Sequence, residues 1–265
     1  MNPLTSTIGR TIASAIFAGA ISALAALPGQ AGENLDAIKA EGVIRIGTEG
    51  TYAPFTYHDA SGKLVGFDVE IGEAVAEKLG VKPEFVEGKW DGLIAGLDVN
   101  RYDTVINQVG ITEERKQKFD FSDPYIASKA ALIVREDNAD IKGFGDLKGK
   151  KAAQSLTSNY GKMAEEAGAE LVGTDGFDQS IALVVQGRAD ATLNDSLSFL
   201  DFKKKQPNAP VKIAATADDA AYSGIIVRKG DPELVAAINQ ALKDIKADGT
   251  YQEISEKYFG EDVSR

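Results

Sequence analysis

Buried strand patterns alternate with amphipathic helix patterns along this chain, and this alternation restricts the fold more than any other feature. Residues 43–47 form an apolar strand pattern, and a helix pattern follows that we expect Asp68 to cap and Gly80 to end. The apolar positions of that helix lie on one stripe: Phe67, Ile71, Ala74, Val75 and Leu79. A strand around 85–86, a helix over 91–97 and a strand over 102–106 come next. The order predicts an α/β fold with open, mostly parallel sheets and helices on their faces.

A short sequence pattern occurs twice in the chain. Residues 101–107 (RYDTVIN) and 188–194 (RADATLN) share Arg, Asp and Asn at a shift of 87 positions, and a helix pattern precedes each copy. Ligands collect at the carboxyl ends of strands in open parallel sheets. Two such ends would place Asn107 and Gln108 opposite Asn194 and Asp195 across a cleft. Ordinary repetition of strand–helix–strand units remains the alternative explanation.

The C-terminal part of the chain predicts two further helices. Asp231 and Pro232 form an N-cap with proline in the first turn, and Gly249 is expected to end this helix. Its buried stripe is Leu234, Ile238, Leu242 and Ile245. Thr250 and Glu253 have the spacing of a capping box for a last helix that ends near Gly260.

The first 31 residues have the pattern of a secretory signal peptide. The apolar run 11–27 follows Arg10, Pro28 interrupts it, and Gly29 and Ala31 place small residues at a cleavage site. A membrane anchor of about 17 residues is the alternative, and it is short for a bilayer. No later segment approaches membrane-spanning length. We therefore expect the rest of the chain to be exported and soluble.

Composition excludes several function classes. Lys and Arg total 29 against 40 Asp and Glu, a net charge of −11, so phosphate backbones and anionic lipids repel the chain. The absence of cysteine excludes disulfides, thiolate metal sites and cysteine nucleophiles. The single histidine, His58, lies in a surface turn. We expect no metal, no cofactor, no catalytic residues and no nucleic-acid partner.

The polar residues after the strands suggest a binding site instead. Thr112 is an N-cap that puts Arg115 in the first helical turn, where a guanidinium and backbone N–H groups suit a carboxylate. Pairing of Arg115 with a surface acid such as Glu113 is the alternative. The loop 155–160 precedes a helix through Met163, and its hydroxyls and amides either cap that helix or contact a ligand.

Three further residues each have two explanations. Asp195, after its strand, is either a partner for an ammonium or a solvated loop acid. Tyr52 and Trp90 lie in turn regions, where one ring face is open to a ligand or both rings pack in the core.

Linked motifs resemble the family 3 extracellular solute-binding proteins, which serve ABC importers of polar amino acids. The matching segments are 47–55 (GTEGTYAPF), 66–70 (GFDVE), 90–94 (WDGLI), 111–125 (ITEERKQKFDFSDPY) and 248–260 (DGTYQEISEKYFG). The similarity covers nearly all of the chain after the leader. It implies a two-lobe periplasmic-binding-protein-like fold with a two-strand hinge that closes on the ligand. Lobe 1 would hold residues 35–127 and 224–265, and lobe 2 residues 128–223.

The resemblance also implies roles for single residues. Arg115 matches the arginine that takes the α-carboxylate, and Asp195 the acid that takes the α-ammonium. Tyr52 and Trp90 match the aromatic walls of the site, and Ser158 a hydroxyl donor to the carboxylate. With the family match, the carboxylate role becomes the preferred interpretation of Arg115.

Within the family, some segments are most similar to the cystine-binding branch. They include Asn107 and Gln108, the stretch 49–52 with Glu49, and Ser158 with Asn159. Gly110 stands where a hydroxyl residue is usual. Cystine has two zwitterionic ends, and Glu49 is a candidate for the second ammonium or for a cationic side chain.

The resemblance predicts a monomeric periplasmic protein that captures an amino acid, L-cystine, and delivers it to an ABC transporter permease. One alternative is a binding protein for another polar amino acid. A second is a dehydratase on the same fold, in which Glu49 or Asp195 would serve as acid or base. A third is a sensor that docks on a membrane receptor.

Overall fold

A computed structural model describes residues 33–264 of the chain. In this part, one five-stranded sheet has the strand order β5-β1-β6-β15-β7. Its strands are β1 (Val43–Thr48), β5 (Lys82–Glu87), β6 (Thr104–Val105), β7 (Phe119–Phe121) and β15 (Ile226–Arg228). Strand β1 is parallel to β5 and β6, whereas β15 is antiparallel to both of its neighbours.

The second five-stranded sheet of the described residues repeats this plan with the order β11-β10-β12-β9-β13. Its strands are β9 (Ala130–Arg135), β10 (Lys151–Gln154), β11 (Glu170–Gly173), β12 (Ala191–Asp195) and β13 (Val211–Thr216). Strand β10 is parallel to β11 and β12, and β9 is the antiparallel strand. The expectation of an α/β fold with mostly parallel sheets is confirmed.

Two short strands connect the sheets. The chain leaves the first sheet through β8 (Ile126–Ser128) and returns through β14 (Ala221–Ser223). These strands form an antiparallel pair in which Ala221 lies opposite Ser128. The predicted two-strand hinge is therefore present. The expected lobe boundaries, after residues 127 and 223, fall within this pair and stay a prediction.

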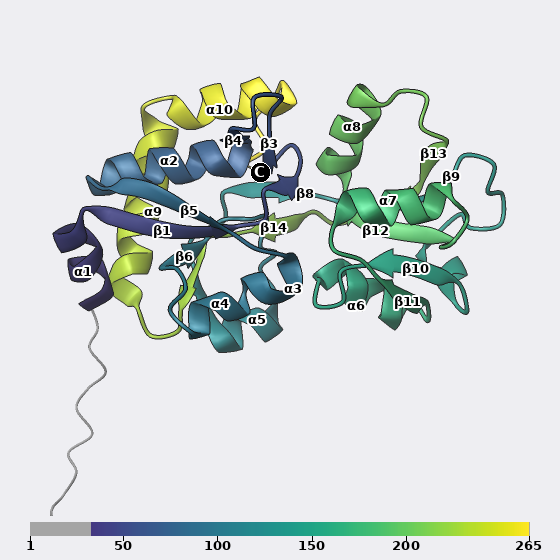
Figure 1. Ribbon diagram of the computed structural model, residues 1–265, viewed down its shortest axis with the longest axis horizontal. Coiled ribbons are helices and arrows are strands. Elements are labelled where there is room, and N and C mark those ends of the chain that lie inside the picture. Colours follow the sequence, from purple (N-terminus) through teal and green to yellow (C-terminus); the bar gives the residue numbers. More distant parts are fainter. Residues whose placement is uncertain (1–32, 265) are drawn as a thin grey trace, which may run out of the picture. The chain divides into compact units, whose positions relative to one another are not determined.

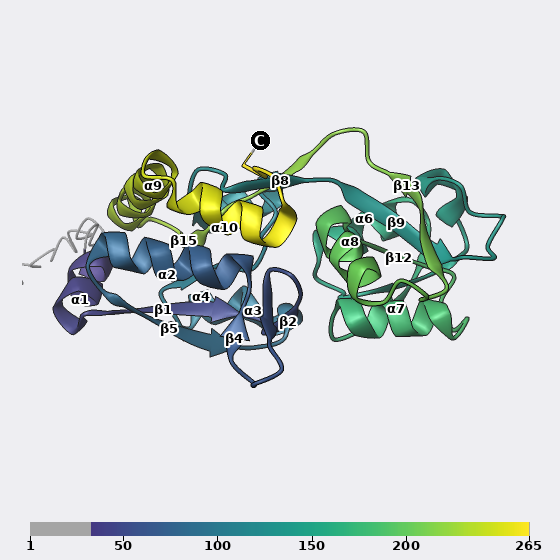
Figure 2. The same ribbon diagram turned by 90° about the horizontal axis from the view of Figure 1, so that it is seen from above.

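Helices cover both faces of the first sheet. On one face lie α1 (Glu33–Glu41), α2 (Phe67–Leu79), α9 (Pro232–Ala247) and α10 (Thr250–Phe259) (Figures 1 and 2). The predicted stripe of α9 is buried together with Ile44 and Ile46 of β1. Short helices α3 (Trp90–Leu93), α4 (Ala95–Asp98) and α5 (Glu113–Lys118) lie below β1 and β6 in Figure 1. Burial on both faces explains why Ile44, Ile46 and Val105 of the central strands are apolar and fully buried.

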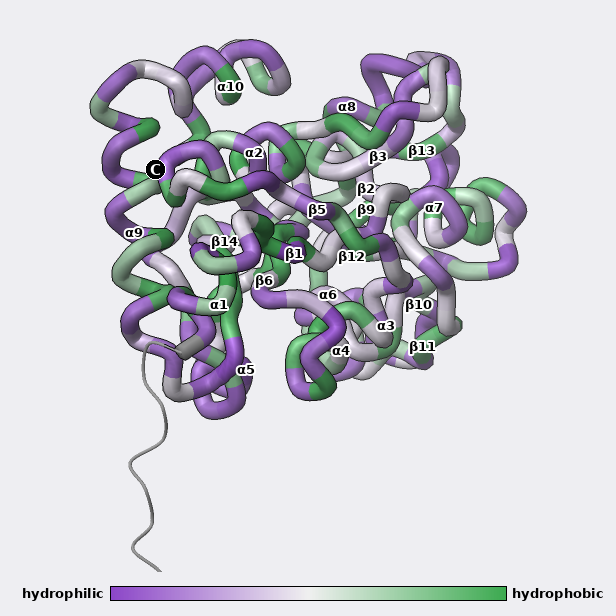
Figure 3. The backbone as a smooth tube through the Cα atoms, turned by 60° about the vertical axis from the view of Figure 1, so that its left-hand side comes forward, coloured by the Kyte–Doolittle hydropathy of each residue, from purple (hydrophilic) through white to green (hydrophobic). Residues whose placement is uncertain are grey.

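The second sheet is also packed on both faces. Alternate residues of β9 point to opposite sides, so Ile133 joins the core that includes α7 (Phe177–Val185) and α8 (Ser196–Lys205). Leu132 and Val134 face the other core, with α6 (Asn159–Glu166) and the 3-10 turn η1 (Phe144–Leu147). A small three-stranded sheet of β2 (Thr51–Tyr52), β3 (Thr56–His58) and β4 (Leu64–Val65) follows β1. Figure 3 shows apolar stretches around β1 and β6, whereas α10 alternates hydrophilic with apolar residues.

Three expectations for helix ends are wrong. Asp68 does not cap α2, because the helix begins after Gly66 and Asp68 lies inside its first turn. Thr250 forms no capping box, because α10 begins at Thr250 itself and its N-cap is Gly249. The helix expected over 91–97 is divided into α3 and α4. A side chain on Gly96 would collide with the Tyr102 hydroxyl, so glycine is required where this ring packs.

The repeated pattern has the same structural role in both sheets. The Oδ2 of Asp103 accepts a hydrogen bond from the backbone N of Arg45 at 2.8 Å, and the Oδ2 of Asp190 accepts one from Lys151 N at 2.8 Å. Asp103 therefore connects the start of β6 to its parallel neighbour β1, and Asp190 connects the start of β12 to its parallel neighbour β10. Both copies end at the carboxyl end of their strands, with Asn107 and Asn194.

The predicted signal peptide, residues 1–31, lies outside the described residues. In the described part, no helix is both long enough and apolar enough to cross a membrane. The same part contains no group of His, Asp and Glu side chains suited to holding a metal ion.

Candidate functional site

A small cavity lies where the ends of the two sheets face each other. The first sheet and the segments after its strands contribute Glu49, Tyr52, Trp90, Asn107 and Gln108. The second contributes Gln154, Ser155, Ser158, Asn159, Tyr160, Gly176, Phe177, Ser180 and Asn194. The cavity is partly open to solvent and has a volume of about 40 Å³. The expected opposition of Asn107 and Gln108 to Asn194 is therefore present, whereas Asp195, expected beside Asn194, does not line the cavity.

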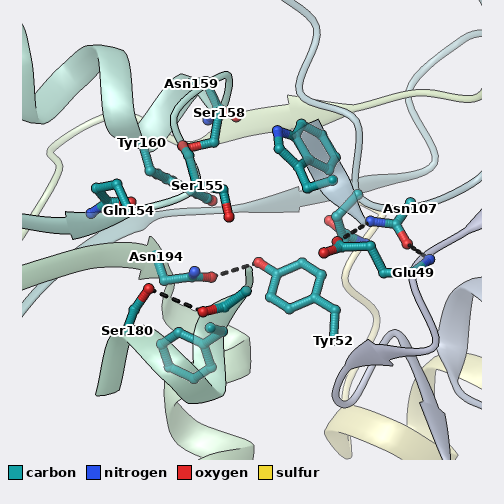
Figure 4. A pocket seen from close by; sticks show the side chains of 14 residues that line it. Glu49, Tyr52, Asn107, Gln154, Ser155, Ser158, Asn159, Tyr160, Ser180 and Asn194 are labelled. Carbon is teal, nitrogen blue, oxygen red and sulfur yellow. Dashed lines mark hydrogen bonds between the residues drawn. The ribbon is translucent and has the colours of Figure 1, made fainter. Parts of the chain in front are cut away.

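Glu49 and Asn107 form a buried pair at the ends of β1 and β6. The amide Nδ2 of Asn107 donates to Glu49 Oε2 at 2.6 Å, and the backbone N of Glu49 donates to Asn107 Oδ1 at 2.8 Å (Figure 4). Loss of solvation raises the pKa of Glu49 from its ordinary value near 4.5 to about 7, although the Asn107 bond opposes the rise. A cation in this cavity would restore the charged form of the carboxyl.

Hydrogen bonds cross the cavity from one sheet to the other. The Tyr52 hydroxyl donates to Asn194 Oδ1 at 2.6 Å, so these side chains point toward one another (Figure 4). Near the rim, Thr157 N and Oγ1 donate to Asp91 Oδ1 at 3.0 and 2.8 Å. These contacts hold the two sides of the cavity together.

Two polar atoms of cavity-lining residues have no hydrogen-bond partner. They are Nε1 of Trp90 and Oε1 of Gln108, and each residue is only 8 % exposed. Buried polar groups are almost always paired, because an unpaired group costs about 1 to 3 kcal/mol. One atom is a donor and the other an acceptor, so these two lining residues together would complement a ligand that carries both kinds of group.

Arg115 lies beside the cavity without being part of its lining. Thr112 caps α5 as predicted, since its Oγ1 accepts from Arg115 N at 3.2 Å. The guanidinium donates to Gly110 O at 3.0 Å and to Asn159 Oδ1 at 3.5 Å, and it lies 5.2 Å from the centre of the Trp90 ring. Partial burial lowers the pKa of Arg115 to about 10.

No carboxylate among the described residues forms an ion pair with Arg115. Glu113, the acid expected in the alternative explanation, pairs with Lys116 at 2.8 Å instead. A partly buried guanidinium without an ion-pair partner is suited to an incoming carboxylate.

Asp195 is buried, 2 % exposed, so its interpretation as a solvated loop acid is wrong. Its carboxylate caps α8 by accepting from Leu197 N at 2.8 Å, and it also accepts from the Ser128 hydroxyl and from Tyr160 OH at 3.4 Å. Loss of solvation raises its pKa from near 3.8 to about 6. Asp195 is not part of the present cavity lining, and Tyr160 lies between the two.

Ser158 and Asn159 begin α6 at the cavity edge. The Ser158 hydroxyl accepts from Gly161 N at 2.9 Å and donates to Ser155 O at 2.7 Å, which confirms the capping role. Gly110 touches the same corner, because a side chain there would meet Arg115 and Asn159. Tyr52 and Trp90 combine both explanations offered for them, since they line the cavity and also belong to apolar core clusters.

Four lining residues were not predicted from the sequence at all: Gln154, Gly176, Phe177 and Ser180. Ser155 and Tyr160 belong to the loop 155–160, which was expected to cap a helix or contact a ligand. Asn194 was signalled by the repeated pattern, and the end of β10 is a signal that could have found Gln154. Phe177 and Ser180 lie on α7, and only the packing of α7 beside β2 brings them to the cavity.

The sequence matches known proteins over nearly its whole folded part. Residues 44–261 match the model of the bacterial extracellular solute-binding proteins, family 3. The L-cystine-binding protein TcyA of Bacillus subtilis is 49% identical over 229 residues, 86% of this chain and 85% of TcyA.

Solved structures of amino-acid-binding proteins are similar to the chain in both sequence and fold. The unliganded, open L-cystine solute receptor of Neisseria gonorrhoeae is 54% identical with a TM-score of 0.59, covering 88% of this chain and 100% of the receptor. An ancestral arginine-binding protein bound to arginine is 44% identical with a TM-score of 0.78, covering 83% of this chain and 99% of that protein. The family match spans both sheets, the hinge strands and the cavity between them. The chain belongs to the bacterial extracellular solute-binding proteins, family 3.

Proposed function

We propose that this protein captures an amino acid, L-cystine, in the cavity between its two sheets and delivers it to the permease of an ABC transporter. The observation that carries the proposal is the cavity itself, which both sheets line and which leaves one donor and one acceptor unpaired. The names of the cystine-binding relatives in Bacillus subtilis and Neisseria gonorrhoeae support this ligand.

Charged groups around the cavity suit the two ends of an amino acid. Arg115 would take the α-carboxylate, because its guanidinium has no carboxylate partner in the described residues. Asp195 would take the α-ammonium after Tyr160 moves, since burial disfavours its charge while no cation is near. Glu49, whose pKa is raised for the same reason, would take the second ammonium of cystine. Tyr52 and Trp90 would form the walls around the disulfide.

The described conformation has the character of a closed state. The partly open cavity, of about 40 Å³, has room for a few water molecules. The chain also superposes better on the arginine-bound relative than on the open receptor, although the open receptor is more similar in sequence. Binding would therefore require the bonds from Tyr52 to Asn194 and from Thr157 to Asp91 to open and re-form around the ligand.

The wider context of the proposal follows from the leader sequence and the family. Cleavage of residues 1–31 would release a monomeric protein into the periplasm, with lobe 1 at 35–127 and 224–265 and lobe 2 at 128–223. Its acidic charge argues against a nucleic-acid partner.

Calorimetric titration tests the proposed ligand. Ligand-free protein lacking residues 1–31 is titrated with cystine, arginine, glutamine and histidine, and the cystine titration is repeated with a reductant that converts cystine to cysteine. We expect cystine to bind most tightly and reduction to weaken binding. If arginine or glutamine binds tenfold tighter than cystine, or if reduction has no effect, the cystine assignment is wrong while amino-acid binding stands.

A further inference from the structure

Asp68 is a fully buried carboxylate that the proposed ligand contacts leave without a role. It lies in the first turn of α2 with 0 % of its surface exposed. Its Oδ2 accepts from the backbone N of Gln108 at 2.8 Å. Its Oδ1 accepts from Gln108 Nε2 at 3.2 Å and from the Tyr125 hydroxyl at 2.9 Å. No Lys, Arg or His of the described residues forms an ion pair with it, so neutral donors alone stabilise its charge.

Gln108 is held in an unusual conformation by this carboxylate. Its φ of 52° lies in the left-handed region, which costs about 1 to 3 kcal/mol for a residue other than glycine. Asp68 compensates this cost by accepting from both the backbone and the side-chain N–H groups of Gln108. The remaining polar atom of the side chain, Oε1, is buried without a partner, and Gln108 lines the cavity.

The chemistry of the two groups determines which way the amide faces. A carboxylate only accepts hydrogen bonds, so the Gln108 side chain must turn its NH₂ group toward Asp68. The opposite orientation would bring Oε1 against the negatively charged Oδ1 and lose the bond. Oε1 is therefore always the free atom while Asp68 is ionised, so Gln108, a residue of the cavity lining, keeps an acceptor that no protein group uses.

We propose that Asp68 is a positioning residue that fixes Gln108 Oε1 as an acceptor for the ligand ammonium and so selects ligands that carry this group. The inference rests on the proposed amino-acid binding and names a determinant of its specificity. A ligand without the ammonium would leave Oε1 buried and unpaired. Burying an unpaired acceptor weakens binding more than the loss of the hydrogen bond alone would.

Asp68→Asn should reverse the direction of the Gln108 amide. The backbone N–H of Gln108 cannot turn, so the Asn oxygen must stay opposite it and the new NH₂ group must face the Gln108 side chain. The Gln108 amide then flips to accept from that NH₂ group, and its own NH₂ group becomes the free atom. A donor would face the ligand ammonium where an acceptor stood before.

Matched ligand pairs measure this effect. L-Cystine is compared with 3,3′-dithiodipropionic acid, and L-arginine with 5-guanidinopentanoic acid, by calorimetry at pH 8. The second compound of each pair lacks the α-ammonium. The pH is chosen because burial raises the pKa of Asp68 to about 7, so the carboxylate is mostly ionised at pH 8. The preference of the wild type for the amino acid should fall about 10- to 100-fold in Asp68→Asn.

Two further variants separate positioning from a structural role. Gln108→Met removes the acceptor at nearly constant shape and should lose the same preference, and Asp68→Asn should add little to it. Tyr251→Phe is the control, since its hydroxyl is buried nearby and donates to Tyr125 O at 2.5 Å without contacting Asp68. It should lower the unfolding temperature and leave the ligand preference within threefold of wild type. Thermal unfolding of each variant verifies the fold.

The outcomes are distinct. Loss of preference in both Asp68→Asn and Gln108→Met, with Tyr251→Phe unchanged, supports the inference. Equal weakening of both ligands of a pair, or additive effects of the two variants, would show a structural role and overturn it. If Asp68→Asn does not fold, an unchanged preference in Gln108→Met still overturns it. A wild type that binds none of the amino acids overturns the proposed function, and the inference with it.

Discussion

At the scale of single residues, Arg115 combines partial burial with the absence of a carboxylate partner among residues 33–264. Its contacts are a backbone carbonyl, an amide oxygen and the Trp90 ring. We expect Arg115→Lys to weaken amino-acid binding by about 2 to 5 kcal/mol, because an ammonium cannot form the planar pair of bonds to a carboxylate. Calorimetric titration measures the change. Arg101→Lys, in which the exchanged group lies at the surface and donates to Glu87 O, is the control and should bind normally. Unchanged affinity in Arg115→Lys would contradict the carboxylate role.

The raised pKa of Glu49 leads to a prediction about the stability of the fold rather than about ligand affinity. Its pKa rises from near 4.5 in the unfolded chain to about 7 in the fold, so the folded state holds the proton more tightly. This group therefore lowers the free energy of unfolding as pH rises from about 4.5 to 7. Glu49→Gln removes the effect and keeps the acceptor for Asn107. The variant should match wild type at pH 4 and exceed it by ~3 kcal/mol at pH 8.

Urea unfolding of ligand-free protein at the two pH values measures this difference. Glu87→Gln is the control, because it removes the charge of an acid that is exposed at the surface. A Glu49→Gln variant that gains as much stability at pH 4 as at pH 8 would argue that the gain does not come from burying the charge.

At the scale of elements, the start of α6 shows how one hydroxyl serves the fold at the edge of the cavity. Ser158 accepts from Gly161 N and donates to Ser155 O, so both functions of its hydroxyl are in use. We expect Ser158→Ala to lower the free energy of unfolding by about 1 kcal/mol, as the loss of an N-cap does. Its effect on cystine affinity should be smaller than that of Arg115→Lys. Urea unfolding and calorimetry on the same preparation give both values.

A larger effect of Ser158→Ala on binding than on stability would change the interpretation of this helix start. If Ser158→Ala abolished binding and left stability unaffected, the hydroxyl would turn to the ligand in the bound state, as the family resemblance suggests. Ser158→Thr keeps the hydroxyl and should preserve stability in either case.

At the scale of the whole molecule, surface ion pairs join the two sides in addition to the bonds at the cavity. Lys89 lies 2.6 Å from Asp175, and Lys162 lies 3.0 Å from Glu114. Such exposed pairs contribute little energy in water, so they cannot hold a closed state by themselves. A ligand that contacts both sides adds its differential affinity to the closed state.

We therefore expect small-angle scattering to give a smaller radius of gyration with saturating cystine than without ligand. Arg115→Lys at the same cystine concentration should keep the larger value, since it binds poorly. Identical profiles of the wild type in both conditions would contradict closure on the hinge.

Most elements and part of the site could be predicted from the sequence, because local interactions determine them. The stripe of α9 and the N-caps at Thr112 and Asp231 all follow from residues close in the chain. Motif matches supplied seven of the lining residues: Glu49, Tyr52, Trp90, Asn107, Gln108, Ser158 and Asn159. Arg115, Gly110 and Asp195 lie behind that lining, and Phe177 and Ser180 reach it only because α7 packs beside β2.

The sequence by itself determined the alternation of strands and helices, the repeated plan of the two sheets and the acidic, cysteine-free character of the chain. Tertiary structure alone decided what each polar atom faces. The sequence predicts Asp68 as a helix cap, but the N-cap of α2 is Gly66. The hydrogen-bond partner of Asp68 is Gln108, which lies 40 residues away in the chain. The physical reason is burial, because a carboxylate inside the fold accepts from whichever donors the packed sheets bring to it. Two buried polar atoms of cavity-lining residues, Gln108 Oε1 and Trp90 Nε1, are left unpaired by the same packing.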